Sequence, residues 1–257
     1  MKHERIYLRE NCENVYMDTY ILDSVVEGSE TYPKKPLVVI CPGGAYKFVS
    51  KREAEPVALN FNAAGIHAVV VNYSLCENFP TALEDVSNAV VKVREMAEEW
   101  EVDTDRIIVC GFSAGGHLAA SLGVFWNSEV KRDDKLNKPN GMLLCYPVIT
   151  SKEKTHGESI YNISHGDEEL IKKASLEDWV NEDCPPTFIW HTFTDELVPV
   201  ENSIYMLSAL AEKKIPTEAH IYPIGWHGLS LATEQVGSTL PYVQGWMNLA
   251  INWIKNL

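Results

Sequence analysis

The chain lacks the features of disulfide-rich or membrane-spanning proteins. Its six cysteines form no CxxC pair, and Cys41, Cys110 and Cys145 lie in apolar runs, so we expect buried free thiols. No stretch approaches the roughly 18 uncharged apolar residues that a spanning helix needs, and residues 1–10 have no apolar signal-peptide segment. The sequence therefore predicts a soluble cytoplasmic protein without membrane contact, although a signal peptide already removed would leave no trace here.

Positive charge is also scarce. Lys and Arg number 22 against 36 Asp and Glu, which gives a formal net charge of −14. This charge repels polyanions, so we expect no nucleic acid and no anionic membrane as a partner. With 257 residues, 46% of them hydrophobic, the chain has an ordinary globular composition, and one large domain over residues 1–257 is the simplest interpretation.

Short β-branched runs alternate with segments of helical period, which indicates a wound α/β domain. Continuous apolar runs, suited to central parallel strands covered on both faces, occupy residues 36–41, 67–71, 106–110 and 141–145. Further strands are expected at 187–190 and 218–222, and a half-exposed one at 15–22.

The clearest predicted helix begins at Thr81, where Thr81 and Glu84 read as a capping box and the apolar residues that follow share one face. Other helices are expected at 200–213 and 242–257. Residues 150–183 are a polar insertion after the sixth strand. This insertion is either a lid over the carboxyl edge of the strands or a solvated surface excursion, and the sequence leaves both open.

The segment Gly111-Phe-Ser-Ala-Gly115 carries the strongest chemical signal. It joins a buried strand to a segment that can begin a helix, which is the setting of a nucleophile elbow. There the serine has a strained backbone, and the glycines avoid collisions with the neighbouring strand and helix. Ser113 is the predicted nucleophile, and a glycine-rich turn selected only for packing is the alternative.

A serine hydroxyl needs a base to become a nucleophile. His227 lies in a glycine-flanked loop after the last predicted strand, from which an imidazole can reach the sheet edge, so it is the predicted base. His191, at the end of a strand, is the rival. His117 and His220 are expected to be structural histidines.

The base in turn needs a carboxylate that orients its ring. Asp195 follows the strand at 187–190 and precedes a proline-opened helix, which is where the acid of this fold should lie. Glu196 is the adjacent alternative.

An oxyanion hole would combine the amide after the nucleophile, Ala114, with amides from the loop after the third strand. That loop reads Cys41-Pro-Gly-Gly-Ala-Tyr46, so Gly44 and Ala45 are the predicted donors. The residues predicted to contact substrate flank these motifs, with a place in the core as the alternative for the aromatic ones: Gly43, Tyr46, Phe112 and Trp226.

With these motifs, the chain resembles α/β-hydrolase-fold serine esterases of the hormone-sensitive-lipase-like branch, close to small acetylesterases and xylan-associated carbohydrate esterases. The resemblance runs from about residue 36 onward. That branch typically reads His-Gly-Gly-Gly in the oxyanion loop and Gly-Asp-Ser-Ala-Gly-Gly at the elbow. This chain departs from that pattern at Pro42, Ala45 and Phe112. It is similar to the small acetylesterases in two motifs: Pro-Gly-Gly followed by a small residue and an aromatic one, and His227-Gly-Leu229.

The resemblance implies a three-layer α/β-hydrolase fold with a mostly parallel central sheet. It also implies a carboxylesterase that forms an acyl-enzyme on Ser113 and acts on small-molecule esters, with acetylated sugars as the expected class. Only about 35 residues precede the first central strand, too few for a large cap that lines a long acyl channel, so a short acyl group is expected. No metal or organic cofactor is implied, and the oligomeric state stays open.

Two other functions fit the same fold. A serine peptidase uses the same three residues, but relatives of that kind usually carry a tyrosine after the serine and a large extra domain, whereas Ala114 follows here. A non-catalytic binding protein would have lost catalysis, but all three catalytic positions are filled. If His227 must be neutral to act, activity should rise with pH between about 6 and 7.5.

Overall fold

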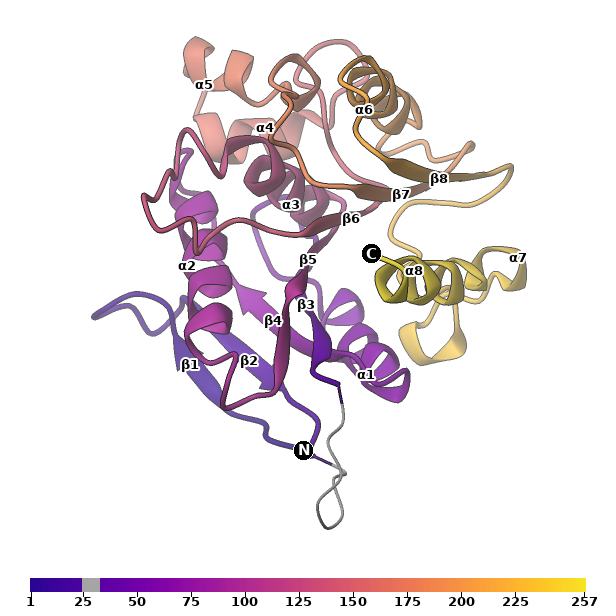
Figure 1. The fold of residues 1–257 in the computed structure, drawn as a ribbon. Helices are drawn as coiled ribbons and strands as arrows, with labels where there is room; N and C mark the ends of the chain where they lie inside the picture. Colours follow the sequence, from indigo (N-terminus) through magenta and orange to yellow (C-terminus); the bar gives the residue numbers. More distant parts are fainter. Residues whose placement is uncertain (25–32) are drawn as a thin grey trace.

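The apolar runs pair into one central sheet (Figure 1). In the computed structural model, which describes residues 1–24 and 33–257, the strand order is β1-β2-β4-β3-β5-β6-β7-β8. The strands are Arg5–Tyr7 (β1), Tyr16–Tyr20 (β2), Lys35–Cys41 (β3), His67–Asn72 (β4), Val102–Phe112 (β5), Gly141–Cys145 (β6), Thr187–Thr192 (β7) and Thr217–Tyr222 (β8). β2 pairs antiparallel with β1 and β4, and the other pairs are parallel. The predicted mostly parallel sheet is confirmed.

Helices cover both faces of this sheet. They are Glu55–Ala63 (α1), Thr81–Glu95 (α2), Ala114–Phe125 (α3), Gly157–Ser164 (α4), Glu168–Lys173 (α5), Glu201–Glu212 (α6), Pro241–Gln244 (α7) and Trp246–Lys255 (α8). Short 3-10 turns lie at Lys51–Glu53, Leu176–Asp178 and Glu234–Val236. Side chains of α2, α3 and α6 join one core cluster and those of α1 and α8 the other, so the architecture has three layers (Figure 1).

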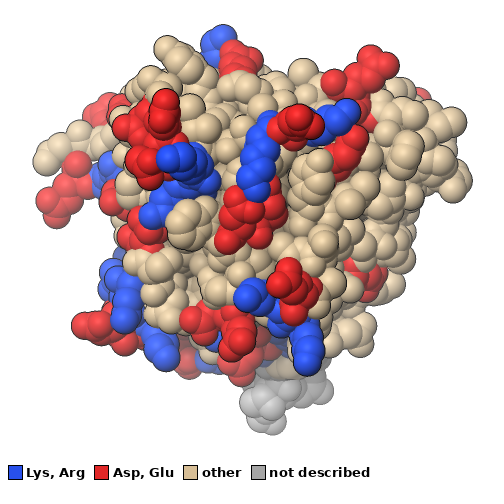
Figure 2. Space-filling model, turned by 90° about the horizontal axis from the view of Figure 1, so that it is seen from above, with Lys and Arg blue, Asp and Glu red and all other residues tan. Residues whose placement is uncertain are grey.

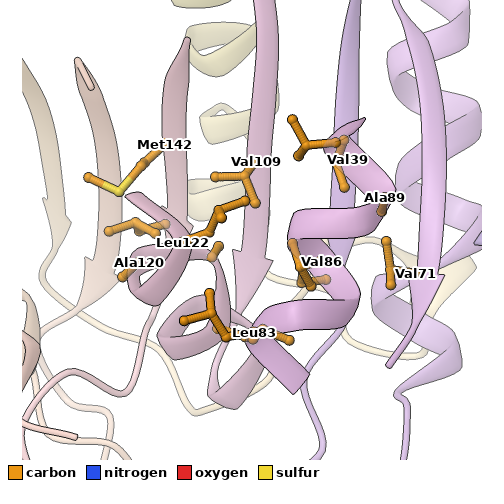
Figure 3. Close-up of a cluster of buried hydrophobic side chains, with 14 of the residues drawn as sticks. Val39, Val71, Leu83, Val86, Ala89, Val109, Ala120, Leu122 and Met142 are labelled. Carbon is orange, nitrogen blue, oxygen red and sulfur yellow. The ribbon is translucent and has the colours of Figure 1, made fainter. Parts of the chain in front are cut away.

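The core between the sheet and helices α2 and α3 fixes the strand that leads to Ser113. Val39, Val71 and Val109 project from neighbouring strands toward these two helices (Figure 3). Fully burying each such side chain contributes about 1.5–3 kcal/mol. Their helical partners in the figure are Leu83, Val86 and Ala89 of α2 and Ala120 and Leu122 of α3. This packing therefore fixes the position of the junction between β5 and α3.

The helix expected at Thr81 forms, but the predicted capping box is wrong. Pro80 is the N-cap residue, and its carbonyl accepts from the Glu84 amide at 2.9 Å. Thr81 is thus already inside the helix, where its hydroxyl makes no cap hydrogen bond. The Glu84 carboxylate instead accepts from the Arg9 guanidinium at 3.3 Å. The helix expected at 242–257 is divided at Gly245 into α7 and α8.

The cysteines are free, and Cys41, Cys110 and Cys145 are buried, as the apolar runs predict. In the described part of the chain, no helix combines the length and the apolar character that crossing a membrane requires. On the face seen in Figure 2, acidic and basic side chains intermingle rather than gather by sign. Many are paired, for example Lys152 with Asp178.

Candidate active site

Ser113 lies at the sharp turn between β5 and α3, with φ 55° and ψ −120°. A non-glycine residue with positive φ is strained, and the close packing around the turn maintains it. A Cβ on Gly111 would lie 2.0 Å from the Gly115 carbonyl oxygen, and one on Gly115 would lie 2.0 Å from that of Cys41. The sequence therefore needs both glycines, and the strained serine predicted for the elbow is present.

The predicted nucleophile, base and acid are brought together. His227 Nε2 lies 2.7 Å from Ser113 Oγ, and His227 Nδ1 lies 2.7 Å from Asp195 Oδ2. Because a carboxylate only accepts, Nδ1 carries the proton and donates it to Asp195, which leaves Nε2 free to accept from the serine hydroxyl. This is the tautomer that a general base toward Ser113 requires.

Asp195 is held from several sides. Its Oδ1 accepts from the amides of Leu197 and Val198 at 3.0 and 2.9 Å. Its Oδ2 also lies 3.3 Å from Nε2 of His191, the rival base, which therefore supports the acid and makes no described contact with Ser113. Burial raises the Asp195 pKa, but hydrogen bonds from His191 and His227 outweigh it and hold the pKa well below its ordinary value. Asp195 is thus ionised throughout the neutral range.

The loop after β3 carries two of the predicted oxyanion donors and lies beside the serine. Gly44 has φ +127° and Ala45 has φ 54°, and both residues line the pocket beside Ser113. The Gly44 carbonyl accepts from the amides of Lys47 and Phe48, which closes the loop on itself. Within the described residues, the amides of Gly44, Ala45 and Ala114 make no backbone or side-chain hydrogen bond, so they remain free to bind a developing oxyanion.

A second buried carboxylate, which the sequence reasoning missed, lies behind this loop. Glu53 is 3% exposed; its Oε2 accepts from the Gly43 amide at 2.8 Å and its Oε1 from the Tyr146 hydroxyl at 2.7 Å. The Tyr146 oxygen accepts from the Ser230 amide at 2.8 Å, and its ring packs edge-on against the His227 ring. One carboxylate thus connects the oxyanion loop to the loop that carries the base.

The insertion also contributes to the site. Asn162 of α4 donates to the Ala45 carbonyl at 2.8 Å, and His156 and Glu158 line the pocket. His117 Nε2 bonds the Ala174 carbonyl at 3.0 Å, so its Nδ1 accepts from the Tyr46 hydroxyl. Residues 150–183 therefore form part of the site wall, and their closing as a lid stays a prediction.

The pocket in front of Ser113 has a volume of about 630 Å³, in the usual range for small-molecule sites. Most of its side chains are polar: Ser50, Lys51, Arg52, Glu53, Ser113, His156, Glu158 and His227. Burial lowers the pKa of His156, with a further contribution from His227. The pocket therefore presents several hydrogen-bonding groups to a ligand.

Two aromatic side chains predicted to contact substrate lie in the core instead. Tyr46 is 2% exposed and bonds His117, while Phe112 is fully buried against Tyr146 and Trp246. The prediction of substrate contact is wrong for both. Successive strand residues face opposite sides of a sheet, and Phe112 at the end of β5 faces the layer of α8.

Gly43 also differs from the prediction, whereas the prediction for Trp226 is untested. The Gly43 amide is used by Glu53, and a Cβ there would lie 2.7 Å from the Phe112 carbonyl oxygen, so Gly43 has a packing role behind the pocket. Trp226 is 50% exposed and does not line the pocket, so its contact with substrate stays a prediction. No group of three or more potential metal ligands occurs among residues 1–24 and 33–257.

The family comparison matches residues 22–210 to the BD-FAE family. Two curated relatives are the endo-1,4-beta-xylanase B of Butyrivibrio fibrisolvens, 35% identical over 83% of this chain, and an acetylxylan esterase of Xylanibacter ruminicola, 31% identical over 88%. The chain spans 34% and 46% of the length of these two proteins, respectively.

Solved structures match over nearly the whole chain. An acetyl ester-xyloside bifunctional hydrolase from Caldicellulosiruptor lactoaceticus has a TM-score of 0.87 and 35% identity, and covers 98% of this chain and 96% of its own. A carboxylesterase from Lactobacillus plantarum also has a TM-score of 0.87, with 29% identity, and covers 100% and 98%. The fold and the family resemblance predicted from the motifs are confirmed: the chain has the α/β-hydrolase fold and belongs to the BD-FAE family.

Proposed function

We propose that this protein is a serine carboxylesterase that hydrolyses short-chain acyl esters, acetyl esters first, of carbohydrates. The observation that carries the proposal is the unbroken hydrogen-bond chain from Ser113 through His227 to Asp195, at a strained elbow beside free amides. The acetylxylan esterase and the carboxylesterase to which the chain is similar support the same reaction class.

The geometry supports acyl transfer in two steps. Ser113 Oγ attacks the ester carbonyl carbon while His227 Nε2 takes its proton, and the amides of Gly44, Ala45 and Ala114 receive the oxyanion. His227 then returns the proton to the departing alcohol, leaving an acyl-enzyme. Water, deprotonated by the same nitrogen, then attacks the acyl carbon. The bond to Ser113 Oγ breaks, His227 returns the proton to that oxygen, and the acid is released. Asp195 keeps the proton on Nδ1 and stabilises the imidazolium throughout.

The pocket wall favours a polar alcohol over a long acyl chain. Hydroxyl groups of a sugar can bond the neutral imidazole of His156 and the charged groups of Arg52 and Glu158, whereas a hydrocarbon chain would remove their water without replacing those hydrogen bonds. The side chains of Ala45, Phe48, Val49 and Leu197 form an apolar part of the wall, which can hold a short acyl group.

The test compares p-nitrophenyl acetate, butyrate and octanoate, and then the release of acetate from an acetylated xylo-oligosaccharide. We expect kcat/KM to be highest for acetate and to fall with chain length. The Ser113→Ala variant should lose the activity on every ester. A preference for octanoate would contradict the short acyl group. Failure to hydrolyse any of these esters while an acetylated sugar still binds would favour a non-catalytic binding protein.

A further inference from the structure

A second cavity, of about 460 Å³, lies next to the catalytic pocket. Val49 and Lys51 line both, so the two cavities adjoin at these side chains. A ligand that fills the catalytic pocket and extends past Lys51 would enter the second cavity. We call this second cavity the side groove.

One wall of the side groove is the outer end of the sheet. Tyr16 of β2 pairs with Asn72 of β4, and Asp18 pairs with Val70, so all four side chains project from one face. Asn72 ends β4 at the carboxyl edge of the parallel strands, which is also the edge where Ser113 lies. The groove therefore leads away from the catalytic pocket over β4 and β2.

The other wall is the segment that enters α1. Glu55 and Pro56 at the start of this helix face the strand side chains across the groove. Val49, Pro56 and Val70 give the groove an apolar floor. Polar side chains surround this floor. Some of them are hydrogen-bond donors or acceptors that have no short hydrogen bond to another described residue.

Those rim groups select a class of ligand. Within the described residues, the Lys51 ammonium and the Tyr16 hydroxyl have no hydrogen bond or ion pair, and Glu55 has only a 3.4 Å contact from the Tyr20 hydroxyl. Asp18 is neutralised by the Arg5 guanidinium. A groove with opposite charges, free donors, free acceptors and an apolar floor suits a neutral hydroxylated chain, whose C–H faces and hydroxyl groups match both kinds of surface. An acyl chain would leave the rim groups desolvated.

We propose that the side groove binds the sugar units of an oligosaccharide whose ester occupies the catalytic pocket. This inference rests on the proposed esterase function and gives it a substrate class: esters of oligosaccharides rather than of single sugars. Lys51 lies between the cavities and contacts the sugar unit that joins them.

The kinetic test uses the double variant Tyr16→Phe/Glu55→Ala, which changes two side chains of the groove that do not line the catalytic pocket, with acetylated xylotetraose, acetylated xylose and p-nitrophenyl acetate as substrates. The matched control is Tyr242→Phe/Glu95→Ala, which changes two exposed side chains outside both cavities. Loss of the hydrogen bonds to the Tyr16 hydroxyl and the Glu55 carboxylate should raise KM for the tetraose ester by about tenfold or more. The two small esters should be hydrolysed as by the wild type, and the control should match the wild type on all three.

The binding test does not depend on catalysis. Unacetylated xylotetraose should bind the Ser113→Ala protein, measured by titration calorimetry, and binding should weaken by a similar factor when Tyr16→Phe/Glu55→Ala is added. Equal KM values of the groove variant and the wild type for the tetraose ester would overturn the proposal, as would xylotetraose binding that the added substitutions leave unchanged. If the wild type does not hydrolyse p-nitrophenyl acetate, the esterase function is overturned instead, whatever the binding result.

Discussion

Two buried carboxylates flank the catalytic centre in contrasting surroundings. Asp195 is bonded by two histidines and two amides, and its hydrogen bond continues through His227 to the nucleophile. Glu53 is bonded by an amide and a tyrosine hydroxyl and has no ion pair within the described residues. In the proposed mechanism, the first arrangement serves proton transfer, and the second fixes the backbone of the loop that would receive the oxyanion. One buried acid would therefore act in the chemistry and the other in positioning the loop.

The largest expected effect comes from Asp195→Asn. An asparagine can donate to Nδ1 and so favours the wrong tautomer of His227, which should lower kcat by about 10⁴-fold. The neighbouring Glu196→Gln is the matched control, because Glu196 is exposed and has no described contact with His227. Steady-state kinetics on p-nitrophenyl acetate measure both. If Glu196→Gln were the damaging variant, the assignment of the acid would be wrong.

A smaller effect is expected for Glu53→Gln. The Gly43 amide and the Tyr146 hydroxyl both donate to Glu53. In a glutamine, the NH2 group would face one of these donors, and the repulsion should displace the Gly43 loop. A displaced oxyanion loop should lower kcat by up to about 10²-fold with little change in KM. Tyr146→Phe should give part of the same loss, and the double variant should lose less than the sum of the two free-energy changes. Unchanged kcat in both single variants would refute the positioning role.

The contrast also explains what the sequence could predict. Ser113, Asp195 and His227 follow strand ends in a fixed chain order, and the elbow glycines mark the turn, so the triad is readable from local pattern. The central parallel strands are also readable, because continuous apolar runs indicate strands that are covered on both faces. These signals are local in the sequence, and the catalytic residues each follow the end of a predicted strand.

Other parts of the site depend on contacts that no local pattern contains. Glu53 stands in a polar stretch, and its buried carboxylate accepts from the Gly43 amide and from the hydroxyl of Tyr146, which lies far along the chain. Asn162 holds Ala45 from an insertion whose helices are too short to show a clear period. Tyr46 and Phe112 were expected at the pocket because of their place in the motifs, but the direction of each side chain is set by the core.

Acid should weaken the contact between His117 and Tyr46, the residue that follows the predicted oxyanion donors. Burial lowers the pKa of His117 from 6.5 to about 4, so between these values the unfolded chain binds a proton that the folded chain does not. Stability should therefore fall as the pH falls from about 6.5 to about 4, and protonation would remove the acceptor of the Tyr46 hydroxyl. Asp195, with its depressed pKa, stays ionised over this range.

Melting temperatures measured across that range test this difference. In the His117→Gln variant, the amide can still donate to Ala174 and accept from Tyr46 but does not titrate, so its melting temperature should depend less on pH than that of the wild type. An identical pH dependence in the two proteins would show that His117 contributes nothing to the acid sensitivity.

The central claim is that Ser113 is a nucleophile activated by His227 and Asp195. A fluorophosphonate, which reacts covalently with activated serines, tests it most directly by mass spectrometry of the intact protein and of its peptides. We expect one adduct per chain, on the peptide that contains Ser113, much slower labelling in Asp195→Asn, and none in Ser113→Ala. An adduct on another residue, or equal labelling of Ser113→Ala, would contradict it.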